Sequence, residues 1–172
     1  GVDADGAAIV AVDMGAPSFD PRVVPIRSAD EHVDLPIPTP SCGGVPPRAT
    51  CLSMGNPHAV VFVDDVASAP VTTLGAEIEA SPFFPDRVNV EFVRVVARDR
   101  LEMRVFERGS GETAACGTGA CAALVAAARL GRADRRAEVA MRGGVAVVSW
   151  EPDDRVTLTG TSALHALEAH SP

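Results

Sequence analysis

The sequence has 172 residues, of which 47% are apolar and 22% are charged, a composition typical of a globular domain with a real core and not of a disordered chain. Fifteen basic residues against 23 acidic ones give a net charge of −8, which argues against nucleic acid or an anionic membrane as the main partner. All the basic residues are arginine, so the chain can neither hold pyridoxal phosphate as a Schiff base nor complete a Walker A loop.

The first half of the chain predicts short strands and one helix. Its many prolines between residues 17 and 47 restrict that stretch to short edge strands. A turn at residues 55–58 separates two further strands, and residues 71–80 predict a short helix. The four predicted strands are residues 7–13, 30–35, 49–53 and 59–63.

The second half predicts a hairpin, a buried helix and three more strands. Residues 109–119 are small and glycine-rich, which indicates a flexible loop. The helix at 118–130 carries no charge until its last turn, so we expect it to be buried on every side, with Gly131 as its C-terminal cap. The fold class is therefore α+β, a mostly antiparallel, barrel-like sheet wrapped around that helix. The hairpin strands are residues 88–96 and 101–107, and the last three strands are 138–142, 145–150 and 155–159.

The four cysteines predict free thiols and no disulfide framework. A chain of this length can fold without disulfides, no secretory signal is evident, and neither a C-x-x-C pair nor a Cys/His cluster with zinc spacing occurs. We therefore expect a cytoplasmic location and no metal site. The sequence contains no apolar run of about 18 residues, the length that a membrane-spanning helix needs. The four are Cys42, Cys51, Cys116 and Cys121.

Cys116 is the candidate for chemistry because it lies immediately before the buried helix. Free N–H groups and the helix dipole at that position are expected to lower a thiol pKa. The N–H groups of Gly117 and Gly119 could also hold a carboxylate beside the sulfur. The alternative is that Cys116 is a small buried filler, the role we expect for Cys121.

Four polar residues near other strand ends are weaker candidates. Glu107 and Arg108 close a strand, where a charged pair is usually solvated, but here it precedes Cys116 and could bind the ammonium and carboxylate groups of an amino acid. Asn56, which precedes a proline, fits turn chemistry as well as ligand binding. Asn89 is a polar residue inside an apolar strand.

Residues 117–122 also fit the dinucleotide-binding pattern G-x-G-x-x-A, with Glu138 about 20 residues further on. That pattern requires a strand running straight into the first glycine. Here ten residues separate the predicted strand end at Glu107 from Gly117, and no βαβ series surrounds them, so we do not expect a nucleotide site.

Several spaced motifs together resemble the diaminopimelate epimerase family over nearly the whole chain. The longest is FERGSGETAACGTGACAA at residues 106–123. MGNPH at 54–58 with VFVDD at 61–65, and FPDRVNVEF at 84–92, are similar to two further motifs of the family. VDMG at 12–15 and VTLTG at 156–160 match in the expected order.

The resemblance implies a reaction that needs neither cofactor nor metal, the inversion of the α-carbon of LL-diaminopimelate to give the meso form used in lysine and peptidoglycan-precursor biosynthesis. Two cysteines would face opposite sides of the substrate, one removing the α-proton as thiolate and the other returning a proton as thiol. Cys116 would be one of them. Gly117 and Thr118 would bind the α-carboxylate, and Glu107 the α-ammonium. At the distal end of the substrate, the resemblance places Asn56, Asn89 and Arg108, with His58 supporting the cysteines.

The second cysteine of this family comes from an N-terminal domain with its own Cys-Gly-Asn-Gly turn, which this sequence lacks. The resemblance therefore implies that residues 1–172 are the C-terminal domain, that the first strand links it to the missing N-terminal half, and that it is inactive alone. A homodimer is also expected, from the apolar face that the absent half would cover. Two alternatives are an epimerase or racemase of another amino acid, and a binding module in which Cys116 is inert.

Overall fold

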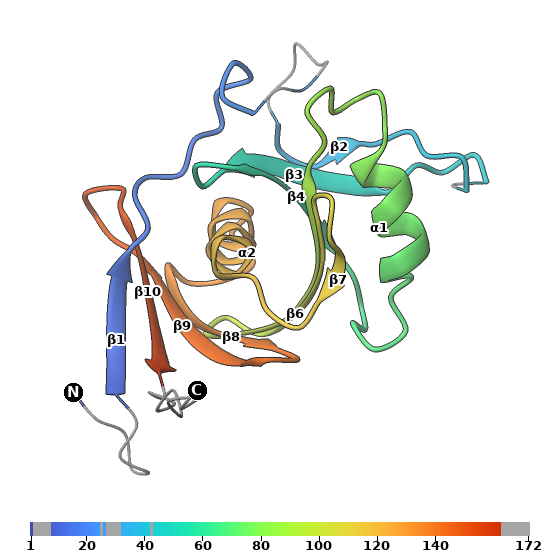
Figure 1. The fold of residues 1–172 in the computed structure, drawn as a ribbon. Coiled ribbons are helices and arrows are strands. Elements are labelled where there is room, and N and C mark those ends of the chain that lie inside the picture. Colours follow the sequence, from blue (N-terminus) through green and yellow to red (C-terminus); the bar gives the residue numbers. More distant parts are fainter. Residues whose placement is uncertain (2–7, 25, 27–31, 42, 163–172) are drawn as a thin grey trace, which may run out of the picture.

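The fold is α+β, a mixed ten-stranded sheet accompanied by two helices (Figure 1). The computed structural model describes residues 1, 8–24, 26, 32–41 and 43–162. The strand order is β1-β10-β9-β8-β6-β5-β4-β3-β2, with β7 beside β6. The elements are β1 (Ala8–Asp13), β2 (Leu35–Pro36), β3 (Arg48–Ser53), β4 (Pro57–Phe62), α1 (Val71–Glu79), β5 (Asn89–Ala97), β6 (Arg100–Glu107), β7 (Gly111–Thr113), α2 (Gly117–Arg129), β8 (Arg136–Met141), β9 (Gly144–Trp150) and β10 (Val156–Ser162).

Most neighbouring strands run antiparallel, and the exceptions are the parallel pairs β4–β5 and β6–β8. The sheet curves around α2 in Figure 1, while its strand order runs open from β1 at one edge to β2 at the other. A closed, barrel-like form stays a prediction.

Helix α2 is where the predicted helix at residues 118–130 lies. Its small side chains let the surrounding strands approach closely, and every residue from Gly119 to Ala127 is buried. The helix ends in a Schellman motif, because Gly131 has a positive φ of 70° and its N–H bonds to Ala128 O while the N–H of Arg132 bonds to Ala127 O. The predicted glycine cap is thus confirmed.

The two helices pack on opposite faces of the sheet, and the strand period of two sends side chains alternately to each. Along β5, Val93 and Val95 belong to the core around α2, whereas Val90 and Phe92 belong to the core beside α1. Alternation therefore places Glu91 on the α2 side of β5.

Two predicted elements need correction. The stretch at 109–119 is not simply flexible, because β7 pairs with β6 within it, and this strand is too short to show a pattern of its own. The expected edge strand at 30–35 is confined to β2, and residues 30 and 31 lie outside the described part, as do residue 7 and Cys42. The other predicted strands, the hairpin and the helix at 71–80 are confirmed to within a few residues.

Candidate active site

The candidate site surrounds the N-terminus of α2, where three neighbouring strands deliver polar side chains. His58 comes from β4, next to Asn89 of β5 in the parallel register. Glu107 ends β6, on the same face as the buried Val105. Because β4 and β5 are parallel and β6 runs back beside β5, these polar groups gather at one end of the strands.

Cys116 is the N-cap residue of α2, with an extended backbone and 8% of its surface exposed. Burial raises the pKa of its thiol to about 11, and hydrogen bonds from the Thr118 hydroxyl and the Gly119 backbone offset this only in part. The expectation of a lowered pKa was therefore wrong. A helix N-terminus acts locally, but here the loss of water around the sulfur outweighs it.

A chain of hydrogen bonds, which we call the thiol chain, leads from Cys116 into the interior. Cys116 Sγ lies 3.6 Å from Thr118 Oγ1, and Asn56 Nδ2 donates to the same hydroxyl at 3.3 Å. His58 Nε2 lies 2.9 Å from Asn56 Oδ1, and His58 Nδ1 lies 2.7 Å from Glu91 Oε1. The structure thus joins three of the candidate side chains, those of Cys116, Asn56 and His58, to the candidate Thr118.

Glu91 is the one member of the thiol chain that was not predicted from sequence to be a site residue. Its side chain and that of His58 have no exposed surface, and within the described part of the chain Glu91 Oε2 has no hydrogen-bond partner. Burial raises the pKa of Glu91, although the neighbouring His58 acts in the opposite direction. The sequence did hold a signal, because the strand period puts this carboxyl group on the same face as Val93 and Val95.

Gly119 provides the space in which two members of the thiol chain, Glu91 and Cys116, come close together. A Cβ atom at this position would lie 2.9 Å from Glu91 Oε1 and 3.3 Å from both Cys116 Cβ and Cys116 Sγ. Any side chain here would therefore displace the carboxyl group or the thiol. Gly117 is less crowded, since its Cβ would meet only the end of the Leu158 side chain at 3.2 Å.

The remaining candidates form a second group that runs from the buried Asn89 to the partly exposed Glu107 and the exposed Arg108. Asn89 Nδ2 donates to Pro57 O at 2.9 Å, and Asn89 Oδ1 accepts from the Arg108 N–H at 2.9 Å. Glu107 Oε1 accepts from the Thr113 hydroxyl. Asn89 therefore ties two chain segments together.

The buried side chain of Glu79 holds in place the turn at residues 108–110, which follows β6. Glu79 of α1 accepts from the Gly109 N–H at 3.0 Å and from Arg87 Nη1 at 3.2 Å. Arg108 Nη1 also donates to Asp86 O at 3.2 Å. Neither Glu79 nor Thr113 was identified from sequence, because each acts through a contact that only the fold makes, across 30 residues for Glu79 and across six for Thr113.

Other kinds of site find little support among the described residues. No three His, Cys, Asp or Glu side chains cluster to hold a metal ion within this part of the chain, and no described helix is long and apolar enough to span a membrane. Cys51 and Cys121 are buried free thiols. The glycines of α2 follow β7, which does not neighbour β8 in the sheet, so the dinucleotide arrangement is not formed.

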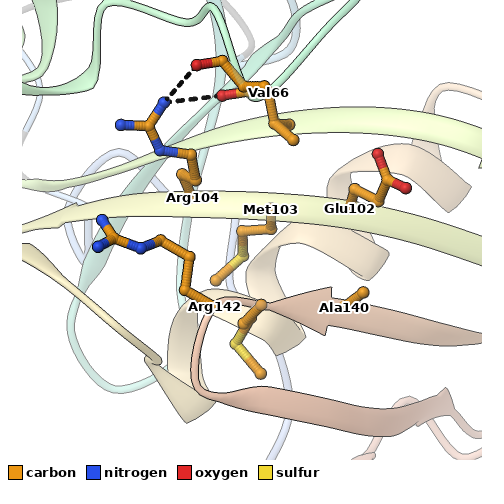
Figure 2. A pocket seen from close by; sticks show the side chains of 8 residues that line it. Val66, Glu102, Met103, Arg104, Ala140 and Arg142 are labelled. Atoms are coloured by element: carbon orange, nitrogen blue, oxygen red, sulfur yellow. Dashed lines mark hydrogen bonds between the residues drawn. The ribbon is translucent and has the colours of Figure 1, made fainter.

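A surface pocket lies elsewhere, between β6, β8 and the 66–67 segment (Figure 2). It measures about 520 Å³, and none of the predicted site residues is among its lining. Figure 2 shows Arg104 beside Val66, with Arg142 pointing toward the same region. These two arginines hold the carboxylate of Glu112 between them.

Comparison with known proteins agrees with the motifs. Residues 50–164, more than half of the chain, match the family model described as diaminopimelate epimerase. A diaminopimelate epimerase from Moorella thermoacetica is 50% identical over 88% of this chain and 54% of its own length. One from Microcystis aeruginosa is 46% identical over the same shares. The chain spans about half the length of the curated relatives it matches.

Solved structures share the fold at low sequence identity. A predicted epimerase from Pseudomonas aeruginosa matches 95% of this chain and 60% of its own, with a TM-score of 0.56 and 21% identity. A probable proline racemase from Agrobacterium radiobacter matches 95% and 55%, with a TM-score of 0.57 and 18% identity.

Proposed function

This chain belongs to the diaminopimelate epimerase family, and from that premise we propose that it supplies one half of the active site of an amino-acid epimerase. The reaction is the inversion of LL-diaminopimelate to the meso form. Cys116 is one of its two acid/base groups, and a second cysteine comes from an N-terminal half. The observation that carries the proposal is the meeting of Cys116 with three other candidate residues, Thr118, Asn56 and His58, at the start of one buried helix.

The proposed role of α2 is to stabilise negative charge on the substrate. The first N–H groups of a helix have no intrahelical partner, so those of Gly117 and Thr118 are free to bind an α-carboxylate. An amino acid's α-proton is weakly acidic, and its removal needs the carboxylate held in a site from which water is excluded. Burial of α2 on all sides supports such a site.

The proposed role of the second group (Asn89, Glu107 and Arg108), together with Asn56, is to orient the substrate. Glu107 binds the α-ammonium, while Arg108, Asn89 and Asn56 bind the distal end. The carboxylate of Glu107 is partly exposed, and the Thr113 hydroxyl is its one side-chain partner among the described residues, so it retains acceptor capacity. The tie from Glu79 to Gly109 supports the fixed position that orientation requires.

We also propose that the curved sheet becomes half of a larger, barrel-like assembly when the N-terminal half joins it. Strand β1 has one neighbour, β10, and all six of its residues are exposed. Ile9, Val10 and Val12 are apolar and 40–46% exposed. An exposed apolar edge strand favours association, with the missing half or with a second copy of the chain.

A binding domain without catalysis is the second candidate. The raised pKa of Cys116 favours it, because a thiol with that pKa is protonated at neutral pH and does not remove protons in this chain alone. The same protonated thiol suits the proton-returning role in the epimerase. Catalysis distinguishes the two candidates.

The test is α-proton exchange, followed by NMR with LL-diaminopimelate in deuterated water. We expect no exchange with this chain alone, and exchange with inversion once a matching N-terminal half is added or in the complete enzyme. Cys116→Ala should abolish inversion while circular dichroism shows an intact fold. Full turnover in that variant would contradict the mechanism, and no exchange in any preparation would leave the binding domain.

A further inference from the structure

We propose that Glu91 is a positioning residue for Cys116, because together with His58 it holds one buried proton and orients the thiol chain so that the Thr118 hydroxyl donates to the sulfur. This inference rests on the proposed function for the catalytic role of Cys116. It assigns Glu91 no contact with substrate.

The buried pair of Glu91 and His58 is most stable when it carries no net charge. The Glu91 and His58 side chains have no exposed surface, and Glu91 Oε2 has no hydrogen-bond partner among the described residues. A carboxylate with one unsatisfied oxygen is costly in such a place unless its charge is compensated. One proton shared between Glu91 Oε1 and His58 Nδ1, 2.7 Å apart, keeps the pair neutral as a whole, whether it is written as acid and imidazole or as carboxylate and imidazolium.

The next step concerns the other ring nitrogen of His58. In both forms of the neutral pair the second hydrogen lies on Nε2, so Nε2 donates. The group facing it at 2.9 Å is the carbonyl oxygen of Asn56, an acceptor. Glu91 therefore fixes which way round the Asn56 amide lies, although the two residues do not touch.

The orientation of Asn56 then decides what Thr118 does. With its oxygen toward His58, Asn56 presents Nδ2 to Thr118 Oγ1 at 3.3 Å. A hydroxyl that accepts from Asn56 has its single hydrogen left for another acceptor, and Cys116 Sγ lies 3.6 Å away. A donor aimed at sulfur stabilises the thiolate relative to the thiol. With the amide reversed, the hydroxyl would donate to Asn56 and this stabilisation would be lost.

A simpler view makes Glu91 only a negative charge near the thiol. The groups that face Cys116 include two carboxyls, Glu91 from β5 and Glu107 from β6, with His58 of β4 behind them, while β10 contributes the apolar Leu158 near Gly117. A bare charge on Glu91 would disfavour the thiolate, so its removal would ease ionisation of Cys116. Our proposal predicts the opposite sign.

The experiment measures the rate at which iodoacetamide alkylates Cys116 in this chain as a function of pH, with the modified residue located by fragmentation mass spectrometry. The rate follows the thiolate fraction, and one pKa unit corresponds to about a tenfold change at pH 8. We expect Glu91→Leu and Thr118→Val each to slow alkylation about threefold to tenfold. Glu91→Gln should stay within about twofold of wild type, because its amide can donate to Nδ1 and keep the hydrogen on Nε2.

Two controls isolate the path. Glu107→Gln removes the other nearby carboxylate and should speed alkylation, which calibrates a pure charge effect. In the Thr118→Val background, Glu91→Leu should cause no further slowing, because its influence passes through the hydroxyl. Faster alkylation in both Glu91 variants, or independent slowing in the double variant, would overturn the proposal.

A measurement on the wild-type chain keeps the proposal testable even where Glu91→Leu does not fold. Nitrogen-15 NMR of the histidine rings, with His58 identified by its loss in His58→Gln, should show Nε2 protonated at pH 7. A His58 ring with a bare Nε2 would refute the proposed orientation. None of these readouts needs turnover, so the role of Glu91 can stand where α-proton exchange fails, and can fall where exchange succeeds.

Discussion

Two carboxyl groups on neighbouring parts of the same sheet have opposite environments. The Glu91 side chain has no exposed surface, His58 is its only side-chain partner among the residues described, and burial raises its pKa. Glu112 of β7 accepts from Arg104 at 2.8 and 3.1 Å and from Arg142 at 2.9 Å. These arginines, Arg104 foremost, lower the pKa of Glu112.

The difference shows how one chain uses the same functional group for two purposes. Beside α2 no guanidinium reaches Glu91 in the described structure, so its proton stays within the pair with His58 and can direct hydrogen bonds. Beside the pocket of Figure 2, two guanidinium groups pair with Glu112, and these ion pairs tie β6, β7 and the β8–β9 turn together. Arginine is suited to that task because its charge is fixed and its donors are planar.

The largest effect on stability should come from breaking the interior pair on one side. His58→Leu leaves the buried carboxyl of Glu91 without a partner, and we expect the free energy of unfolding to fall by about 3 kcal/mol. Urea denaturation followed by circular dichroism measures the change. Breaking the ion pair between Glu112 and Arg104, described below, should cost less.

The matched control is the double variant His58→Leu with Glu91→Leu. Replacing both members of a buried polar pair by apolar groups removes the unsatisfied charge, so the double variant should lose at least about 1 kcal/mol less than the sum of the two single variants. Additive losses would mean that the two side chains do not stabilise each other.

The second prediction tests how tightly the interior pair is packed against Cys116. Gly119→Ala would place a methyl group 2.9 Å from Glu91 Oε1, and we expect a loss of about 2 kcal/mol together with altered alkylation of Cys116. Gly117→Ala should cost less, because only the end of the Leu158 side chain must move.

Gly160→Ala in β10 supplies the neutral reference, since nothing lies within 4 Å of the added methyl group. Thermal unfolding of the three variants should follow the order Gly119, Gly117, Gly160, from the largest loss to the smallest. An unaffected Gly119→Ala would imply that the space between Glu91 and Cys116 is larger than the structure has it.

The fold was largely predictable because its strongest elements carry local patterns. The uncharged run at 113–128 predicted α2, and alternation predicted the β5–β6 hairpin. Strand β7 could not be predicted, because its three residues are held by pairing with β6 and by the contact of Glu112 with Arg104. Such an element has no pattern outside its tertiary setting.

The candidate site was predictable where residues lie in glycine-rich motifs and not where burial decides the chemistry. Cys116, Asn56 and His58 were identified from sequence, and the structure joins them. Glu91 was not assigned a role, since a single glutamate in a strand is usually exposed, and only the register with β4 places it against His58. The direction of the Cys116 pKa was also wrong, because desolvation depends on packing distant in sequence.

A third prediction concerns the two arginines that pair with Glu112. The Arg104 side chain is 20% exposed, and its Nη1 donates to the carbonyl oxygens of Val66, Ala67 and Ala69. Its Nε and Nη2 donate to Glu112. Arg104→Met should therefore lower the free energy of unfolding by about 1–2 kcal/mol. Arg142→Met is the matched control, since Arg142 is 62% exposed and its loss should cost less than about 1 kcal/mol. Equal losses would show that the carbonyl contacts contribute little.

The smallest expected effect is the pH dependence that Glu112 gives to the free energy of unfolding. The folded pKa of Glu112 lies below its ordinary value near 4.5, because Arg104 and Arg142 favour the charged form. Its contribution to stability is therefore complete above about pH 4.5 and is lost as the pH falls through the folded pKa. Glu112→Gln should be less stable than wild type at pH 7 by a few tenths to about 1 kcal/mol, and the two should converge toward pH 3. Urea denaturation at pH 7, 5, 4 and 3 measures this, and 1 M salt should narrow the gap at pH 7 by screening the ion pairs. Parallel curves at every pH would mean that Glu112 keeps its ordinary pKa in the folded chain, and the contrast with Glu91 would then rest on burial alone.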